Sequence, residues 1–283
     1  MDFDINFLRQ WIGRIQESSD VATAAPLSCL NATLNCEDLR TQIGDEIPPA
    51  GHWLYFLNPT RQSELDVNGH AKKGEFLPPV PLERRMWAGG RLKFILPLHI
   101  GDSITRTSEI IDVRSKEGKT GSLVFVIVRH QIYGPNGLSI EEEHDIVYRS
   151  GQSNNIRSQP QKEKKIPIWQ RTVDADSVML FRYSALIFNG HRIHFDREYT
   201  TKYEGYPGLI VHGPLIATLL LDLCRRKAPS ERLVYFDYRA RGPIFDLGPF
   251  TINGSPIDRG AELWALDQQK NLAMIGKAEF ENK

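Results

Sequence analysis

The sequence predicts an α+β fold in which each half of the chain wraps an antiparallel sheet around one helix. Both halves of the 283-residue chain place a helix-like segment before about four strand-like runs, which short turns separate. A polar stretch divides the two halves. A sparse repeat relates them, since a proline-aliphatic pair precedes a turn at residues 97–102 and again at residues 243–248. These three observations favour two similar units in one chain.

The first unit is predicted to begin with an amphipathic helix, because Ile5, Leu8, Ile12 and Ile15 share one helical face. Successive strands are expected over residues 91–149, where the run LVFVIV is rich in β-branched and aromatic residues. Turn residues separate these strands, at Gly101-Asp102, Glu117-Gly118 and Pro135-Asn136-Gly137. Residues 1–149 are therefore predicted to form an N-terminal unit.

Residues 150–165, SGQSNNIRSQPQKEKK, form the clearest boundary in the chain. Only one of these sixteen residues is aliphatic, so burial cannot offset the entropy lost when the segment becomes ordered. We expect a linker here that crosses the surface. Residues 166–283 then form the C-terminal unit.

The second unit is predicted to be helical over residues 172–227 and rich in strands over residues 232–281. Residues 234–240, VYFDYRA, are its strongest strand. From Pro214 onward apolar residues recur with helical spacing, which predicts a helix with one buried stripe. Pro214 suits the first turn of this helix, because its missing N–H would have no intrahelical partner there.

The start of this helix and the segment before it carry the candidate chemistry. Asn189 stands five residues before His194, and His212-Gly213 leads directly into the helix. An imidazole titrates near pH ~6.5 and can take and return a proton, while a neighbouring amide can orient a water molecule. Gly213 leaves a free N–H at a helix N-terminus, where the backbone dipole stabilises a developing oxyanion. This combination predicts addition of water to an activated double bond.

Two simpler interpretations of these residues are kept open. His191 and His194 lie three residues apart and could bind a metal ion together with Asp196 or His212. No longer ligand pattern supports such a site, and we expect no metal. Each histidine could also be an ordinary structural residue, and the nearby glycines and prolines could simply mark loops.

The same segment resembles the MaoC-like, or hydratase-2, class of hotdog enzymes. The family signature begins with a tyrosine, matched by Tyr183, and ends in an aliphatic residue and a histidine, matched by Ile193 and His194. The chain departs from that signature at Asn189, where the family has a catalytic aspartate. It departs again at His191-Arg192, where the family has Asn-Pro.

A subgroup of double-hotdog hydratases that act on mesaconyl-C4-CoA or itaconyl-CoA is more similar still, as is a mitochondrial acyl-carrier-protein dehydratase. The FN-x-HRIH and EGYPGL-x-VHGPL patterns match the chain from Phe188 to Leu215, and the hydratases share the RRMWAGGRL run of residues 84–92. The resemblance implies a double-hotdog fold and a hydro-lyase of the enoyl-CoA hydratase or 3-hydroxyacyl-CoA dehydratase type. The first half has no counterpart of the Asn189 and His194 pair, so we expect a non-catalytic, pocket-forming N-terminal hotdog and one active site per chain.

In the expected mechanism His194 is the general base, Asn189 holds the water, and Gly213 donates its N–H to the enolate oxygen. Since a carboxamide exchanges no protons, His194 must do more of the acid–base work than in relatives with aspartate. The acyl group is expected to carry a second carboxylate, because arginines cluster near the pocket and a guanidinium can clamp a carboxylate. The predicted substrate-binding residues are Tyr183, Arg182, Arg84, Arg85, Trp87, Arg91 and His212.

Other possibilities stand beside this one. The arginines could instead pair with local acids such as Glu83 and Asp196, or bind CoA phosphates. The chain could be a 3-hydroxyacyl-thioester dehydratase of fatty-acid metabolism that acts on CoA or acyl-carrier-protein substrates. It could also be a non-catalytic hotdog that only binds acyl thioesters, because the family aspartate is missing.

Composition bears on the partners, cofactors and location expected for the protein. Acidic and basic residues are equal at 35 each, which argues against a nucleic-acid binder, and no apolar run reaches the ~18 residues of a membrane span. The chain has no dinucleotide-binding or phosphate-binding glycine motif, so no cofactor is expected. Three cysteines without Cys-x-x-Cys spacing and an acidic start favour a cytoplasmic protein. We expect a homodimer that uses acyl-CoA in itaconate degradation.

Overall fold

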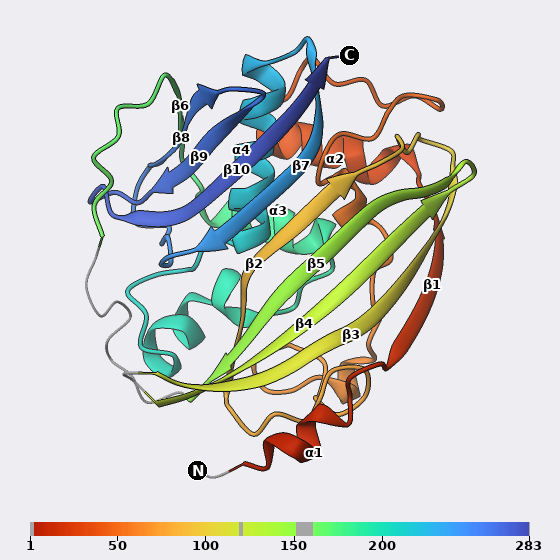
Figure 1. Ribbon diagram of the computed structural model, residues 1–283. Helices are drawn as coiled ribbons and strands as arrows, with labels where there is room; N and C mark the ends of the chain where they lie inside the picture. The colour runs from red at the N-terminus through yellow and green to blue at the C-terminus, as the bar shows by residue number, and fades with distance from the viewer. Residues whose placement is uncertain (1–2, 119–120, 151–160, 283) are drawn as a thin grey trace.

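Ten strands form a single antiparallel sheet in the computed structural model, which describes residues 3–118, 121–150 and 161–282. The sheet curves across the front of the view in Figure 1. Behind it lie the helices α2 (Ala24–Leu34), α3 (Ser177–Leu186) and α4 (Gly213–Lys227). The expected α+β class is confirmed.

The N-terminal half supplies five of these strands. They are β1 (Ile15–Val21), β2 (Arg84–Phe94), β3 (Ser103–Gly118), β4 (Gly121–Gly134) and β5 (Gly137–Arg149). Besides α2, this half contains the short helix α1 (Ile5–Arg9) and the 3-10 helices η1 (Gly51–Leu54) and η2 (Gln62–Glu64).

The C-terminal half supplies the other five strands. They are β6 (Trp169–Val173), β7 (Glu231–Ala240), β8 (Phe250–Ile257), β9 (Gly260–Leu266) and β10 (Leu272–Asn282). Between α3 and α4 lie the 3-10 helix η3 (Arg192–His194) and the π-helix η4 (Tyr199–Tyr203). The predicted strand at residues 234–240 is confirmed within β7.

The two halves are arranged as matching sets that meet in the middle of the sheet. The strand order is β1-β3-β4-β5-β2-β7-β10-β9-β8-β6, so β2 pairs with β7 at the junction. Gly89 permits this contact, because a Cβ on that residue would lie 2.5 Å from the Tyr238 carbonyl oxygen. The two expected sheets are therefore one continuous sheet.

The predicted repeat occupies matching places in this sheet. Residues 97–102 lead into β3, and residues 243–248 lead into β8, the strand that takes the corresponding position in the second half. The division at residues 150–165 stays a prediction, since residues 151–160 lie outside the described part of the chain.

The prediction for the first helix was wrong in its length. Helix α1 ends at Arg9, and Ile15 already begins β1, which pairs with β3. Gly13 explains the break, because its φ of +84° leaves the helical region and its N–H bonds to the Ile110 carbonyl. The helix of this half that packs in the main core is α2, which sequence patterns did not reveal.

Helix α4 is the central element of the core. Its first turn contains Pro214, as predicted. The predicted buried stripe is confirmed, and burial extends around the helix, because every residue from 215 to 224 is buried. The helix packs against the strands β6 to β10, so its N-terminal end has a fixed position relative to the sheet.

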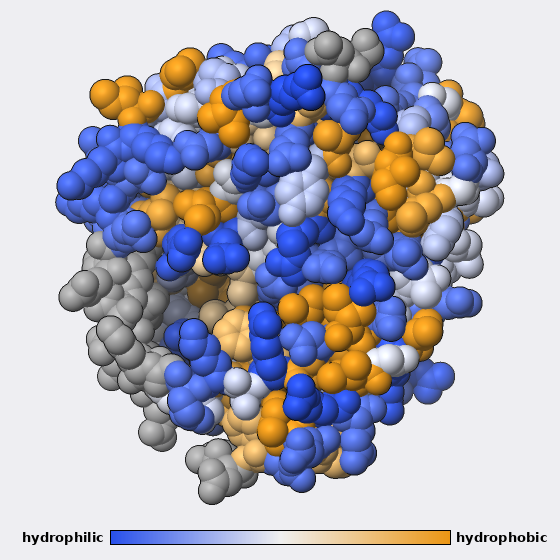
Figure 2. Space-filling view, viewed as in Figure 1, coloured by the Kyte–Doolittle hydropathy of each residue, from blue (hydrophilic) through white to orange (hydrophobic). Residues whose placement is uncertain are grey.

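The long connection from residue 55 to residue 83 contains only η2 among its regular elements, and it carries residues 66–70 to the C-terminal half. On the side of the sheet shown in Figure 2, hydrophobic residues form separate areas among hydrophilic ones. None of the helices in the described ranges is long and apolar enough to span a membrane.

Candidate active site

A cavity of about 710 Å³ opens at the N-terminal end of α4 and is lined by residues from both halves of the chain. It is bounded by β2, by residues 68–77, and by the two segments 189–194 and 210–214. The structure brings together seven of the ten predicted site residues here, namely Asn189, His194, Gly213, His212, Arg84, Arg85 and Trp87. Of these, Gly213 alone contributes no side chain to the lining.

His194 is held in η3 as a neutral imidazole. Its side chain is 8% exposed, and its Nδ1 donates a hydrogen bond of 2.7 Å to the carbonyl oxygen of Ile210. That bond fixes the tautomer and leaves a lone pair on Nε2. Burial lowers the pKa of His194 to about 4, so the ring is uncharged at neutral pH.

His212 supports His194 from one side. The two rings stack with centroids 3.7 Å apart. The Nε2 of His212 lies 2.8 Å from the Ser184 hydroxyl, and its Nδ1 is buried without a partner among the described residues. Burial and the neighbouring His194 hold the pKa of His212 well below its usual range.

Asn189 uses one end of its carboxamide to shape the loop. Its Oδ1 accepts the His191 N–H at 3.0 Å, and its own N–H donates to the Ser184 carbonyl at 2.8 Å. Asn189 lines the cavity, and its Nδ2 amino group has no acceptor among the described residues and remains a donor. Such a group can hold a water molecule through the oxygen of that water.

Gly213 presents an open backbone donor. It is the first residue of α4, and its N–H bonds to no acceptor among the described residues. A Cβ at this position would meet only the Trp87 carbonyl oxygen, at 3.8 Å. The space next to this N–H is thus free for a ligand oxygen, and the helix dipole favours negative charge there.

Two further histidines extend the cluster. The His191 ring lies 5.5 Å from the His194 ring, and the His70 ring lies 4.0 Å from the His191 ring. Burial, with a contribution from His194 and Arg85, lowers the pKa of His191 to about 2. Sequence reasoning missed His70, because no motif marks residues 66–70 and only the folded chain brings them to the site.

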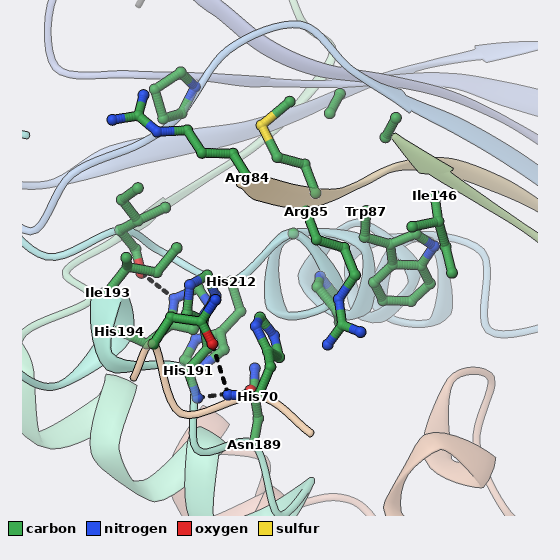
Figure 3. A pocket seen from close by; sticks show the side chains of 18 of the residues that line it. His70, Arg84, Arg85, Trp87, Ile146, Asn189, His191, Ile193, His194 and His212 are labelled. Atoms are coloured by element: carbon green, nitrogen blue, oxygen red, sulfur yellow. Dashed lines mark hydrogen bonds between the residues drawn. The ribbon is translucent and has the colours of Figure 1, made fainter. Parts of the chain in front are cut away.

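The predicted arginines separate into two groups. Arg84 pairs with Glu204 at 3.2 Å, and its side chain points away from the imidazoles (Figure 3). Arg85 pairs with no carboxylate in the described ranges, and Figure 3 shows it directed from β2 into the space between His70 and Trp87. Arg85 is therefore available to a ligand, as are Arg149 and Arg241, which also line the cavity and form no ion pair in the described ranges.

Three predicted substrate-binding residues lie outside the cavity, which is a correction. Arg91 forms ion pairs with Glu143 and Asp145 of the neighbouring strand β5. Arg182 lies on the exposed side of α3. Tyr183 is fully buried behind His212, with the two rings 5.1 Å apart, so it packs under the site and does not line the cavity.

Trp87 closes one side of the cavity. Its ring packs edge-on against Trp53 at 5.1 Å, and it also lines a second cavity of about 180 Å³. In that second cavity the buried Glu142 carboxylate accepts hydrogen bonds from His52, Trp53 and His144. Trp87 thus forms part of the wall between the two spaces.

The alternative metal site finds no support in the geometry. Asp196, a possible third ligand, is bound by the Arg192 guanidinium at 2.7 Å. In the described ranges, no three His, Cys, Asp or Glu side chains are arranged to hold a metal ion.

Comparison with known protein families finds that residues 50–246 match the hydroxyacyl-thioester dehydratases of type 2. The chain is 43% identical over 257 residues to a mesaconyl-C(4)-CoA hydratase of Chloroflexus aurantiacus, and the alignment covers 89% of this chain and 91% of that protein. It is 30% identical over 276 residues to the mitochondrial hydroxyacyl-thioester dehydratase type 2 of Schizosaccharomyces pombe, covering 87% and 90%.

Solved structures show the same architecture. A MaoC-like dehydratase superposes with a TM-score of 0.71 at 12% identity, over 98% of this chain and 100% of the other. A Mycobacterium tuberculosis protein with a double hotdog fold superposes with a TM-score of 0.58 at 11% identity, over 96% of each chain. The predicted double-hotdog fold is confirmed.

Proposed function

The chain belongs to the hydroxyacyl-thioester dehydratase type 2 family, and on that premise we propose that its substrate is an enoyl-CoA with a second carboxylate. As a member of this family it is a hydro-lyase, which adds water to the double bond of an enoyl thioester or removes it from a 3-hydroxyacyl thioester. The acyl group that we propose is a dicarboxylic one, as in mesaconyl-C4-CoA or itaconyl-CoA.

The orientation of His194 is the observation that carries the proposed chemistry. Its Nδ1–H is bound to the Ile210 carbonyl, so the free Nε2 is the only ring position able to accept a proton. The same cavity offers the Asn189 amino group and the unpaired Gly213 N–H. A base, a water-holding donor and an oxyanion donor therefore share one space.

In the proposed reaction, His194 Nε2 takes a proton from water while the water oxygen bonds to Cβ. The electrons of the C=C bond move toward the thioester carbonyl, and the Gly213 N–H stabilises the resulting enolate oxygen. The protonated His194 then gives its proton to Cα, which leaves a hydroxyl on Cβ and a neutral imidazole. General acid–base and oxyanion contributions are each worth about 10²–10³-fold in such reactions.

The second carboxylate is supported by Arg85. A guanidinium that faces a cavity without a carboxylate partner favours an anionic ligand, and a ligand with an alkyl group at that place leaves it unpaired. The 43% identity to a mesaconyl-C(4)-CoA hydratase supports the same choice. Arg84 and Arg91 are already paired with acids, so Arg85 is the one of the three predicted β2 arginines that has no carboxylate partner in the described ranges.

Loss of enoyl-thioester absorbance with purified protein tests the proposal. The panel contains mesaconyl-C4-CoA, itaconyl-CoA, crotonyl-CoA and longer straight-chain enoyl-CoAs. We expect kcat/KM to be highest for the dicarboxylic substrates. Equal or faster turnover of the alkyl substrates would reject the dicarboxylic assignment.

A 3-hydroxyacyl-thioester dehydratase of fatty-acid metabolism is the second candidate. The family match and the 30% identity to the fission yeast enzyme favour it. Enoyl-pantetheine and acyl-carrier-protein substrates added to the same panel separate it from the first. A cytoplasmic location, a homodimer and a place in itaconate degradation stay predictions, which cell fractionation, size-exclusion chromatography and growth on itaconate of a strain lacking the protein would test.

A further inference from the structure

We propose that His70 and Arg85 together bind the second carboxylate of the substrate. This inference rests on the proposed function, because it assumes a dicarboxylic acyl group. It adds His70, a residue that no sequence motif marks, to the Arg85 already proposed to meet the carboxylate. It also predicts which face of the cavity the carboxylate occupies.

The chemistry of the substrate restricts where such a subsite can be. In mesaconyl-C4-CoA the free carboxylate is bonded to Cβ, the carbon that receives the hydroxyl. The groups that bind this carboxylate must therefore lie beside the water-binding residues Asn189 and His194. A subsite at the distant end of a long acyl channel could not bind this carboxylate.

His70 lies at such a place because a loop of the N-terminal half docks on the catalytic segment. Residues 66–70 meet residues 189–192 backbone to backbone, and the Arg192 N–H donates to the Asn68 carbonyl at 3.0 Å. Gly69 has a φ of +87°, and a Cβ there would lie 1.8 Å from the Gly190 carbonyl oxygen. Only glycine permits this approach.

The loop itself is held in a defined shape. The Asp66 N–H donates to the His70 carbonyl at 2.7 Å, and the Gly69 N–H donates to the Asp66 carbonyl at 2.8 Å. The Asn68 side chain accepts the His70 N–H at 2.9 Å. The His70 ring then packs on His191 with centroids 4.0 Å apart, so its position is fixed relative to the catalytic segment.

Arg85 approaches the same place from strand β2. In Figure 3 its guanidinium extends toward the His70 ring from β2. Burial and the charge of Arg85 hold the pKa of His70 well below its usual range, so this ring is a neutral hydrogen-bond donor beside a permanent cation. A carboxylate that enters between them accepts one hydrogen bond from the neutral imidazole and one from the guanidinium, and a methyl group can accept neither.

Two saturated analogues allow the subsite to be tested by binding alone. They are 3-carboxybutanoyl-CoA and isovaleryl-CoA, which differ only by a carboxylate in place of a methyl group. Calorimetry gives the ratio of their Kd values for each protein. We expect the wild-type protein to bind the carboxylate analogue about 100-fold more tightly or better, since hydrogen bonds to charged groups are strong.

Variants assign that preference to the two residues. Arg85→Met should reduce the ratio of Kd values about 100-fold, and His70→Leu should reduce it about 10-fold. His70→Asn, which is close to leucine in size but keeps an N–H donor, should restore most of the ratio. His99→Ala is the matched control, because His99 lies outside both cavities and its side chain is 36% exposed.

The outcomes distinguish the inference from the proposed function. Equal binding of the two analogues by the wild-type protein would reject the dicarboxylic assignment and the subsite with it. A clear wild-type preference that His70→Leu leaves unchanged would overturn the role of His70 while the proposed function stands. The ratio is independent of a loss of folded protein, so a less stable variant still answers the question.

Discussion

His194 and His212 stack face to face, with ring centroids 3.7 Å apart and an angle of 17° between the rings. Two protonated imidazoles at this separation would repel each other strongly, and both rings are shielded from water. Burial keeps His194 neutral, and the neighbouring His194 adds to the burial that lowers the pKa of His212. A neutral imidazole with its Nδ1–H bound to a carbonyl is the form that a general base requires.

The first prediction concerns the titration of His194. Burial lowers its pKa to about 4, so the ring is neutral above that pH and charged below it. NMR titration of the imidazole signals in the free protein, assigned with His194→Asn, should give a midpoint near pH 4 for this residue. A midpoint near pH ~6.5, the value of an unperturbed imidazole, would contradict the neutral-base geometry.

The second prediction concerns the removal of the base. His194→Ala should abolish turnover while the melting temperature shows a folded protein, since no other described imidazole of the cavity has its Nδ1–H bound to a backbone carbonyl and its Nε2 left free. His99→Ala is the control for loss of an imidazole elsewhere. A folded His194→Ala protein with about a tenth or more of the wild-type kcat would refute the assigned role.

The third prediction concerns Asn189, which stands where the family has a catalytic aspartate. Asn189→Ala should lower kcat by roughly 10–10³-fold, because the water loses its donor and the loop loses the bond to the His191 N–H. Asn189→Asp keeps an acceptor for that N–H and adds a negative charge, so it should keep activity and raise the pKa of His194. Unchanged kinetics in Asn189→Ala would show that another group holds the water.

The fourth prediction concerns the oxyanion donor. Gly213→Ala should fold normally, since a Cβ there meets only the Trp87 carbonyl at 3.8 Å, yet the methyl group enters the space of the thioester. Gly213→Val should reduce kcat/KM further. A structure with a bound acyl-CoA whose carbonyl oxygen lies out of hydrogen-bond range of the Gly213 N–H would exclude this assignment.

The fifth prediction concerns stability in acid. The pKa values of His191 and His194 are lowered in the folded chain, to about 2 and about 4, so below pH ~6.5 the unfolded chain binds protons that the folded chain does not. The free energy of unfolding should therefore fall as the pH drops from 6.5 toward 4. Each group contributes up to about 1.4 kcal/mol per pH unit. His191→Asn should make the slope shallower in urea denaturation, and an identical slope would count against the buried neutral cluster.

Sequence patterns could point to the proposed catalytic segment because its parts are local. The spacing of Asn189 and His194 and the start of α4 at Gly213 all lie within one stretch of chain, where short-range geometry decides the structure. The strands β7 and β4 could also be predicted from the sequence, since runs of β-branched and aromatic residues mark them. The segment from residue 5 to residue 15 was misread, because four isoleucines and leucines at helical spacing also fit a short helix followed by a strand.

Long-range relationships could not be predicted in this way. Arg91 stands opposite Glu143 through the register of β2 and β5, and nothing in either strand alone indicates that pairing. His70 reaches the site through the docking of Gly69 on Gly190, a contact between residues far apart in the chain. Arg85 and Arg84 are neighbours in sequence, yet only the folded chain decides that Glu204 pairs with Arg84 and that Arg85 has no carboxylate partner in the described ranges.

The most direct measurement compares mesaconyl-C4-CoA with 3-methylcrotonyl-CoA in the wild-type protein. The two substrates have the same double bond and the same thioester, and a methyl group replaces the carboxylate in the second. A kcat/KM at least about 100-fold higher for mesaconyl-C4-CoA is expected, because only that substrate pairs with Arg85. Equal values, or faster hydration of 3-methylcrotonyl-CoA, would contradict the proposed carboxylate-bearing substrate.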